Sequence, residues 1–194
     1  MSGRGRKPSV VLGVALLARG RAAGFAEFRD TTEAFLTSLT PLIAFPLVGA
    51  ALSLTAGEGM EAVTELFQIL CALLIPAVVS HALARLWGRE AEWLRFIVAF
   101  NWCQWAVPVA AMAALLTLSV LIALGLPGRS IGGFVILGLA AYALWLHWFL
   151  ARAGLGVSRA RALALVICMN IGTAAVLLLP YLPLILSGQP AREG

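Results

Sequence analysis

Five side chains able to exchange hydrogen bonds stand inside long apolar runs of this sequence. They are two imidazoles and three carboxamides: His81, Asn101, Gln104, His147 and Asn170. An amide or imidazole in hydrocarbon is costly unless it is hydrogen-bonded, so each is expected to face another protein group or a ligand. Asn101 and Gln104 share one helical face because they are three residues apart. We call these five residues the polar layer and treat them as candidate binding residues.

No set of residues typical of an enzyme accompanies the polar layer. The sequence contains no P-loop, no H-E-x-x-H, no G-x-S-x-G and no C-x-x-C. Ser80 and His81 are neighbours, but adjacent helical residues point about 100° apart, which disfavours a nucleophile–base contact. Glu65 is the one acid that could enter hydrocarbon, whereas an ion-coupled pump needs a charged group nearer the midplane. We predict a protein without catalytic residues.

The histidines leave one cofactor alternative open. His81 and His147 would lie on different spans at similar depth, as two axial ligands of a haem iron do. The chain has only 2 histidines and no evident glycine-lined face for a haem, so hydrogen bonds to neighbouring helices are the simpler interpretation. The 3 cysteines stand apart in apolar runs and fit small core residues. We predict no cofactor and no metal site.

Composition defines the class of protein that positions these residues. Of 194 residues, 61% are hydrophobic and 12% are charged, and the mean hydropathy is +0.96. A soluble domain carries about 25% charged residues. The sequence therefore predicts an all-α protein, a polytopic bundle of membrane-spanning helices. Nucleic acid is not an expected partner, because the 6 tryptophans are not interleaved with a basic stripe.

Five apolar segments are long enough to cross about 30 Å of hydrocarbon. The predicted spans cover residues 34–54, 62–86, 93–124, 131–151 and 159–186. The third is the longest, so it must tilt, protrude or kink at Pro108. Ser158 is a suitable N-cap for the fifth. A five-span domain is thus expected over residues 34–186, followed by a short extra-cytoplasmic tail, 187–194.

Residues 1–33 form a basic segment before the first span. A short apolar run, 10–18, is flanked on both sides by basic residues: Arg4, Arg6, Lys7, Arg19 and Arg21. The run is too short to cross a bilayer, and arginines directly after it fit a signal-peptide cleavage site poorly. We predict an amphipathic helix in the membrane interface, with these basic residues near lipid headgroups. A retained signal-like segment is the alternative.

The basic residues also predict the orientation. With the N-terminus in the cytoplasm, all of the 14 lysines and arginines except Arg129 and Arg192 fall in cytoplasmic segments. This is a strong positive-inside bias, and it requires an odd number of spans because an even number would break the alternation. We expect a multi-pass protein of the inner (plasma) membrane, with a cytoplasmic N-terminus and an extra-cytoplasmic C-terminus.

This orientation places the polar layer at one depth. Counted from the nearest arginine at about 1.5 Å per residue, the five side chains lie roughly 6 to 14 Å inside the cytoplasmic half. All 6 tryptophans fall on the same side. Interhelical hydrogen bonding explains this clustering most simply. A cytoplasm-facing cavity that binds lipid, peptide or a partner helix is the functional alternative.

Parts of the chain resemble a known family of five-span proteins. The residues that carry the resemblance are Phe28-Arg29-Asp30-Thr31 through Phe35-Leu36, the aromatic and polar box from Phe100 to Pro108, and Trp145-Leu146-His147-Trp148 followed by 153–163. In span number and loop lengths, residues 28–186 also resemble the Yip family, named for its interaction with Rab-type GTPases. The resemblance implies a helical bundle with a cytoplasmic N-terminus. It also implies a role in membrane organisation or trafficking and no catalytic residues.

The predicted function is therefore that of a non-enzymatic integral membrane protein acting through a protein partner or lipid. It would organise membranes or serve as an accessory subunit of a larger complex. Membrane lipid and another membrane protein, or a second copy of the chain, are the expected partners. A small transporter or channel that uses the polar layer is the alternative.

Overall fold

All regular structure in the described part of the chain is helical. The computed structural model describes residues 8–57, 59–125 and 128–182. The elements in chain order are α1 (Val10–Leu17), η1 (Ala22–Glu27), α2 (Thr32–Thr55), α3 (Gly59–Leu86), α4 (Glu90–Cys103), α5 (Ala106–Ala123), α6 (Gly128–Leu155), α7 (Arg159–Leu178) and η2 (Leu179–Tyr181). Five segments are long and apolar enough to cross a membrane, with α4 and α5 forming one of them. The predicted all-α, five-span fold is confirmed.

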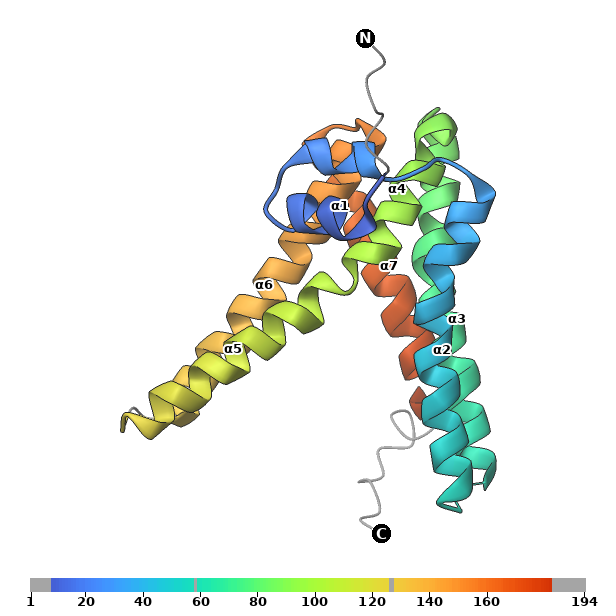
Figure 1. Ribbon diagram of the computed structural model, residues 1–194. Coiled ribbons are helices and arrows are strands. Elements are labelled where there is room, and N and C mark those ends of the chain that lie inside the picture. The colour runs from blue at the N-terminus through green and yellow to red at the C-terminus, as the bar shows by residue number, and fades with distance from the viewer. Residues whose placement is uncertain (1–7, 58, 126–127, 183–194) are drawn as a thin grey trace.

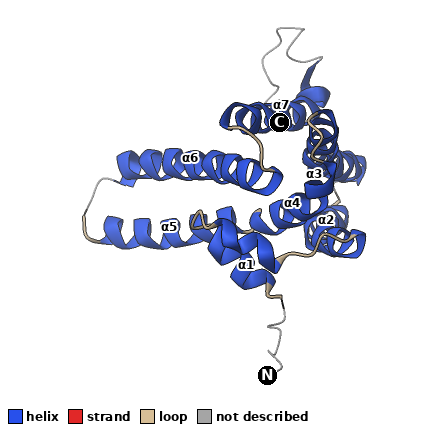
Figure 2. Cartoon of the chain, turned by 90° about the horizontal axis from the view of Figure 1, so that it is seen from above, coloured by secondary structure: helices blue, strands red, loops and turns tan. Residues whose placement is uncertain are grey.

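The helices form two legs joined at one end (Figure 1). One leg contains α2, α3 and α7, and the other is the hairpin of α5 and α6. Helix α4 stands at the junction, together with α1 and η1. We call this the closed end; it carries the loops 87–89 and 156–158. The opposite, open end holds the last turns of α2 and α5, and the legs also separate in the view from above (Figure 2).

Protein packing is concentrated at the closed end. The core contains the fully buried residues Phe96, Ile97, Leu146, Leu150, Leu155 and Leu165. Towards the open end, large apolar side chains lie outside: Phe45 is 64% exposed, Val120 59% and Phe134 76%. Outward apolar side chains are what lipid-facing helices need, because lipid tails are as apolar as the side chains. The outer faces of the legs therefore suit contact with lipid tails rather than with other helices of this chain.

The junction exists because the third span breaks at Gln104 and Trp105. Pro108 lies four residues beyond Gln104, and a proline has no backbone N–H and clashes with the carbonyl of residue i−4. The Trp105 N–H instead bonds to the Trp102 carbonyl oxygen at 3.3 Å, and the helix resumes at Ala106. The predicted kink is thus present one turn before the proline. It lets α5 leave the direction of α4 (Figure 1).

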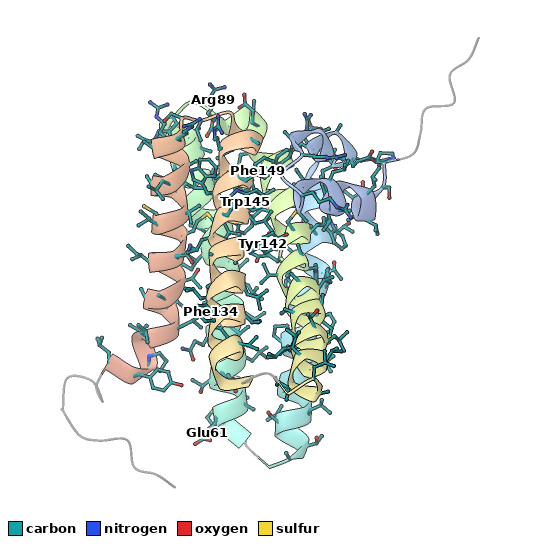
Figure 3. All side chains as sticks on the ribbon, turned by 90° about the vertical axis from the view of Figure 1, so that its left-hand side faces the viewer. Glu61, Arg89, Phe134, Tyr142, Trp145 and Phe149 are labelled. Atoms are coloured by element: carbon teal, nitrogen blue, oxygen red, sulfur yellow. The ribbon has the colours of Figure 1, made fainter. Side chains whose placement is uncertain are left out.

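The N-terminal segment is packed onto the closed end. Helix α1 lies across the bundle, with Gly13 and Leu17 buried, and the Tyr142 hydroxyl of α6 donates to the Ala18 carbonyl oxygen at 3.0 Å. Trp145 and Phe149 follow Tyr142 along the same side of α6 (Figure 3), with successive ring centroids 5.8 and 5.7 Å apart. Helix α1 itself has no polar side chain. The amphipathic character expected of residues 10–18 therefore comes only from the residues that flank the helix.

An ion pair fixes the chain between η1 and α2 to the closed end. The Arg95 guanidinium of α4 donates to the Asp30 carboxylate at 2.6 Å. This hydrogen bond, together with the positive charge of Arg95, lowers the pKa of the Asp30 carboxyl below its usual value. Both side chains are about half exposed, so the pair positions the linker more than it stabilises the fold.

Replacing Pro108 with alanine tests the origin of the two legs. The substitution restores a backbone N–H and removes the ring–carbonyl clash, so α4 and α5 should join and the α5–α6 leg should swing towards α2. Spin labels at the exposed positions Leu52 and Val120 should report a shorter distance by pulsed electron spin resonance. Pro46→Ala is the control, because α2 already continues through Pro46. An unchanged distance in Pro108→Ala would mean that packing, rather than the proline, sets the break.

Candidate functional site

A cavity of about 470 Å³ lies where the two legs meet. We call it the junction cavity. Helices α2, α3, α4, α6 and α7 all contribute to its wall. Most of the wall is apolar, formed by Leu42, Ile69, Ala72, Leu73, Pro76, Phe100, Met169 and Leu177. The polar lining residues are Asn101, Gln104, His147, Asn170 and Thr173. An apolar cavity with a few convergent polar groups is typical of a small-molecule site.

The junction cavity is shut towards the closed end. Phe100, His147 and Met169 line its wall on three different helices. The residues one helical turn nearer the closed end are all fully buried: Phe96, Ala151 and Leu165. A cavity open towards the arginine-rich loops was the functional alternative drawn from the sequence, and the junction cavity does not open on that side. Packed core fills the space between the junction cavity and those loops.

Four members of the polar layer line the junction cavity, but His81 does not. Pro76 is the last residue of α3 that lines the cavity. His81 follows five residues later, so its side chain is rotated by about 140° around the helix axis from that of Pro76. His81 is exposed and lies edge-on against Trp93, with ring centroids 4.7 Å apart. His147 instead packs against Phe100, with centroids 4.9 Å apart. The structure therefore does not bring together the two imidazoles considered as haem ligands.

No alternative metal site is visible in the part of the chain that the structure describes. Residues 8–57, 59–125 and 128–182 contain no group of three or more histidine, cysteine, aspartate or glutamate side chains suited to a metal ion. The two exposed cysteines, Cys71 and Cys168, and the buried Cys103 are all free thiols. The chemistry available at the junction cavity is hydrogen bonding by neutral groups.

Asn101 uses one of its donors to join two helices. The residue is 5% exposed, and its side-chain amide donates to the Ser38 hydroxyl oxygen of α2 at 2.9 Å. The Ser38 hydroxyl donates in turn to the Phe35 carbonyl oxygen at 2.7 Å. Ser38 was not among the predicted site residues. The available signal was its depth in the first span, which matches that of Asn101 in the third.

A second polar contact explains the neighbours Ser80 and His81. The Trp93 indole N–H donates to the Ser80 hydroxyl oxygen at 3.0 Å, and that hydroxyl donates to the Ala77 carbonyl oxygen at 3.2 Å. His81 contacts the edge of the same indole. Both residues therefore hold Trp93 at the start of α4, which is a structural role.

Three polar side chains of the junction cavity, Gln104, His147 and Thr173, make no hydrogen bond with other described residues. Asn170 donates to the Val166 carbonyl oxygen of its own helix at 2.8 Å. By contrast, the Gln104 amide, the His147 imidazole and the Thr173 hydroxyl have no such partner, although all three side chains are partly buried. Such groups are costly at membrane depth unless something else satisfies them. They mark the place where a ligand would be held.

The two predicted membrane-surface residues that the structure describes, Arg19 and Arg21, lie apart from the junction cavity. Arg19 follows α1, Arg21 precedes η1, and both are exposed at the closed end. Arg4, Arg6 and Lys7 fall outside the described residues, as does the predicted tail, 187–194. The structure therefore separates a neutral hydrogen-bonding site between the legs from a basic rim around α1.

Ser38→Ala tests the contribution of the Asn101 contact. Removing the hydroxyl leaves a buried amide unpaired, so the free energy of unfolding in mixed micelles should fall by about 1–2 kcal/mol. A double-mutant cycle with Asn101→Leu should give a coupling energy of about 0.6–1.7 kcal/mol. Ser119→Ala is the matched control, because the Ser119 hydroxyl is exposed and bonds only within α5. A coupling energy near zero would show that the two side chains do not interact in the membrane protein.

Comparisons with known proteins found no match for this chain: no protein-family model, no curated protein and no solved structure matches it. The resemblance to Yip proteins thus stays a prediction based on the residues that carry it. The function proposed below is supported by the junction cavity and its neighbouring helices.

Proposed function

We propose that this protein is a non-enzymatic integral membrane protein that binds a membrane-soluble ligand in the junction cavity. The observation that carries the proposal is the presence of unbonded polar groups in a mostly apolar wall, chiefly the Gln104 amide and the His147 imidazole, with the Thr173 hydroxyl as a third. A ligand with a hydrogen-bonding head would satisfy these groups. Its apolar part would lie along the exposed faces of the legs, in place of bulk lipid.

The wall of the junction cavity favours a neutral head group. No aspartate, glutamate, lysine or arginine is among the residues that line it. A charged head in this position would be buried without a counter-charge, which is costly. An amide and an imidazole can both donate and accept hydrogen bonds, so they suit a hydroxyl, carbonyl or amide. The ligand class supported best is an uncharged lipid, isoprenoid or similar amphiphile.

A transmembrane helix of a partner fits the junction cavity less well. A spanning helix needs about 20 residues, or about 30 Å, of unobstructed path. The legs diverge towards the open end (Figure 1), but the fully buried Phe96, Ala151 and Leu165 leave no path towards the closed end. A lipid-like molecule that enters sideways between the legs meets no such obstacle. The same packed core disfavours a channel or transporter, because a solute path would need a second opening at the closed end.

We also propose that the closed end faces the cytoplasm of a cell with an inner (plasma) membrane. Nine of the ten basic residues in the described part of the chain belong to segments at this end, which supports the orientation through the positive-inside rule. Arg89 and Glu61 mark the two ends of the molecule in Figure 3. The aromatic row of Tyr142, Trp145 and Phe149 lies near the closed end, as interfacial aromatic residues do.

Cysteine labelling of intact cells tests this orientation. In a background without the native cysteines, Ala56→Cys at the open end should react with a membrane-impermeant maleimide. Ala91→Cys at the closed end should react only after the cells are permeabilised. Both alanines are exposed in the structure, so accessibility depends on the membrane alone. The reverse labelling pattern would place the arginine-rich loops outside and overturn the proposed orientation.

Lipid analysis of the purified protein tests the proposed ligand. We expect wild-type protein, isolated in mild detergent, to retain an uncharged lipid that mass spectrometry detects in near-stoichiometric amount. Gln104→Leu and His147→Leu remove the hydrogen-bonding groups while keeping similar volume, and each should reduce retention about fivefold to tenfold. Thermal unfolding of each variant shows whether the fold is intact.

Gln68→Leu is the matched control for these variants. The Gln68 amide lies on α3 outside the junction cavity and donates to the Leu177 carbonyl oxygen of α7. Its loss should leave lipid retention at the wild-type level. Equal retention by the wild type and both cavity variants would contradict the proposal. So would a co-purifying protein that is lost with the same variants and with no lipid retained.

A further inference from the structure

A second hollow lies on the outer side of the molecule, between α1, α2 and α5. Its volume is about 780 Å³, and it shares no lining residue with the junction cavity. Helix α1 lies beside α4 on this side (Figure 2), across the end of the hollow. We call this hollow the α1 groove. Its size falls within the range of about 300–1,000 Å³ found for small-molecule sites.

The wall of the α1 groove is almost entirely apolar. Phe45 of α2 packs against Trp105, with ring centroids 5.0 Å apart, and these rings form one side. Ala110 and Ala113 of α5 form another side, and their small side chains leave the space that a larger residue would fill. Valine and alanine residues of α1 close the end. Such a wall suits an acyl chain.

An exposed arginine, Arg19, lies at the rim of this apolar wall. Arg19 lines the α1 groove and is exposed, and one of its guanidinium nitrogens donates to the Ala15 carbonyl oxygen at 3.1 Å. No carboxylate pairs with Arg19 among the residues that the structure places. Several other closed-end arginines are engaged: Arg95 pairs with Asp30, and Arg152 lies over the Trp148 ring. The remaining donors of Arg19 are therefore available to an anion.

We propose that the α1 groove binds an anionic phospholipid, with the phosphate at Arg19 and an acyl chain along Phe45, Trp105 and Ala113. The charge of the headgroup complements the unpaired guanidinium, and Arg is well suited to bind phosphate oxygens. The acyl chain would cover apolar side chains of the groove that no other part of the protein covers. This site differs from the junction cavity in both place and ligand charge, so it does not depend on the proposed function.

The position of α1 favours a lipid over a protein helix in this groove. A spanning helix of a partner, or of a second copy, would have to pass α1 to reach both membrane surfaces. A phospholipid occupies a single leaflet and can end at α1. A bound lipid would also contact α1, α2 and α5 at once, because all three line the groove. Binding should therefore stabilise the attachment of α1 to the legs.

Native mass spectrometry of the full-length protein in detergent tests the proposal. Dioleoyl phosphatidylglycerol and dioleoyl phosphatidylcholine share acyl chains and differ in headgroup charge. We expect the wild type to bind the anionic lipid at least about fivefold more tightly, with a higher thermal unfolding temperature in its presence. Arg19→Gln should remove most of this preference. Arg159→Gln is the matched control: it removes an exposed arginine at the closed end that does not line the groove.

A second pair of variants tests the acyl-chain contact. Ala113→Trp fills the α1 groove and should weaken binding of both lipids by about fivefold or more. Ala140→Trp is its control, because Ala140 is an exposed alanine of α6 outside the groove. Both tryptophan variants are checked for wild-type unfolding temperature without added lipid.

Three results would overturn the proposal. Equal losses in Arg19→Gln and Arg159→Gln would indicate general attraction of anionic lipid to a basic surface. Unchanged binding by a folded Ala113→Trp would show that no acyl chain enters the α1 groove. A wild-type dimer that dissociates in Ala113→Trp would assign the groove to a second copy of the chain. Loss confined to Arg19→Gln and Ala113→Trp, with both controls unaffected, would support it.

Discussion

The missing backbone hydrogen bond before Pro108 is the constraint on which the rest of the structure depends. The α4–α5 span does not remain one regular helix, and its two halves take different directions at Gln104, one turn before the proline. The first half joins the packed core, and the second forms a separate leg with α6. The junction cavity and the α1 groove both lie beside this break. They share no residue, but each has α4 in its wall.

Polar groups in this chain fall into two kinds, and the difference follows from packing. Asn101, Ser38 and Trp93 are bonded within the closed end, where helices approach closely enough to supply partners. Gln104 and His147 line the junction cavity, where no group of the neighbouring helices forms a hydrogen bond with them. In water such groups would simply be hydrated. In hydrocarbon these groups need a hydrogen-bond partner. The cavity beside the break in the third span is therefore a candidate binding site.

Much of the fold could be predicted from the sequence, because span number and depth follow from hydropathy and helical rise. The depth estimate alone predicted that Asn101, Gln104, His147 and Asn170 lie near one another, and all four line the junction cavity. Rotation about the helix axis could not be predicted in the same way. Helix α3 is apolar around most of its circumference, so nothing in its pattern indicates that His81 faces Trp93 and not the junction cavity. The partner of Asn101 was missed for a related reason, since three hydroxyl residues of α2 lie near the same depth.

The direction in which the junction cavity opens was the least predictable feature, and it changes the functional argument most. Basic residues identify the end of each span that faces the arginine-rich loops, but they carry no information about packing behind those loops. In the structure, the arginine-rich end is the densely packed one, and the apolar end is open. A ligand of the junction cavity must therefore arrive through the bilayer and not from solution. For such a ligand, selectivity comes from a few neutral hydrogen-bonding groups, since lipid tails and leucine side chains are equally apolar.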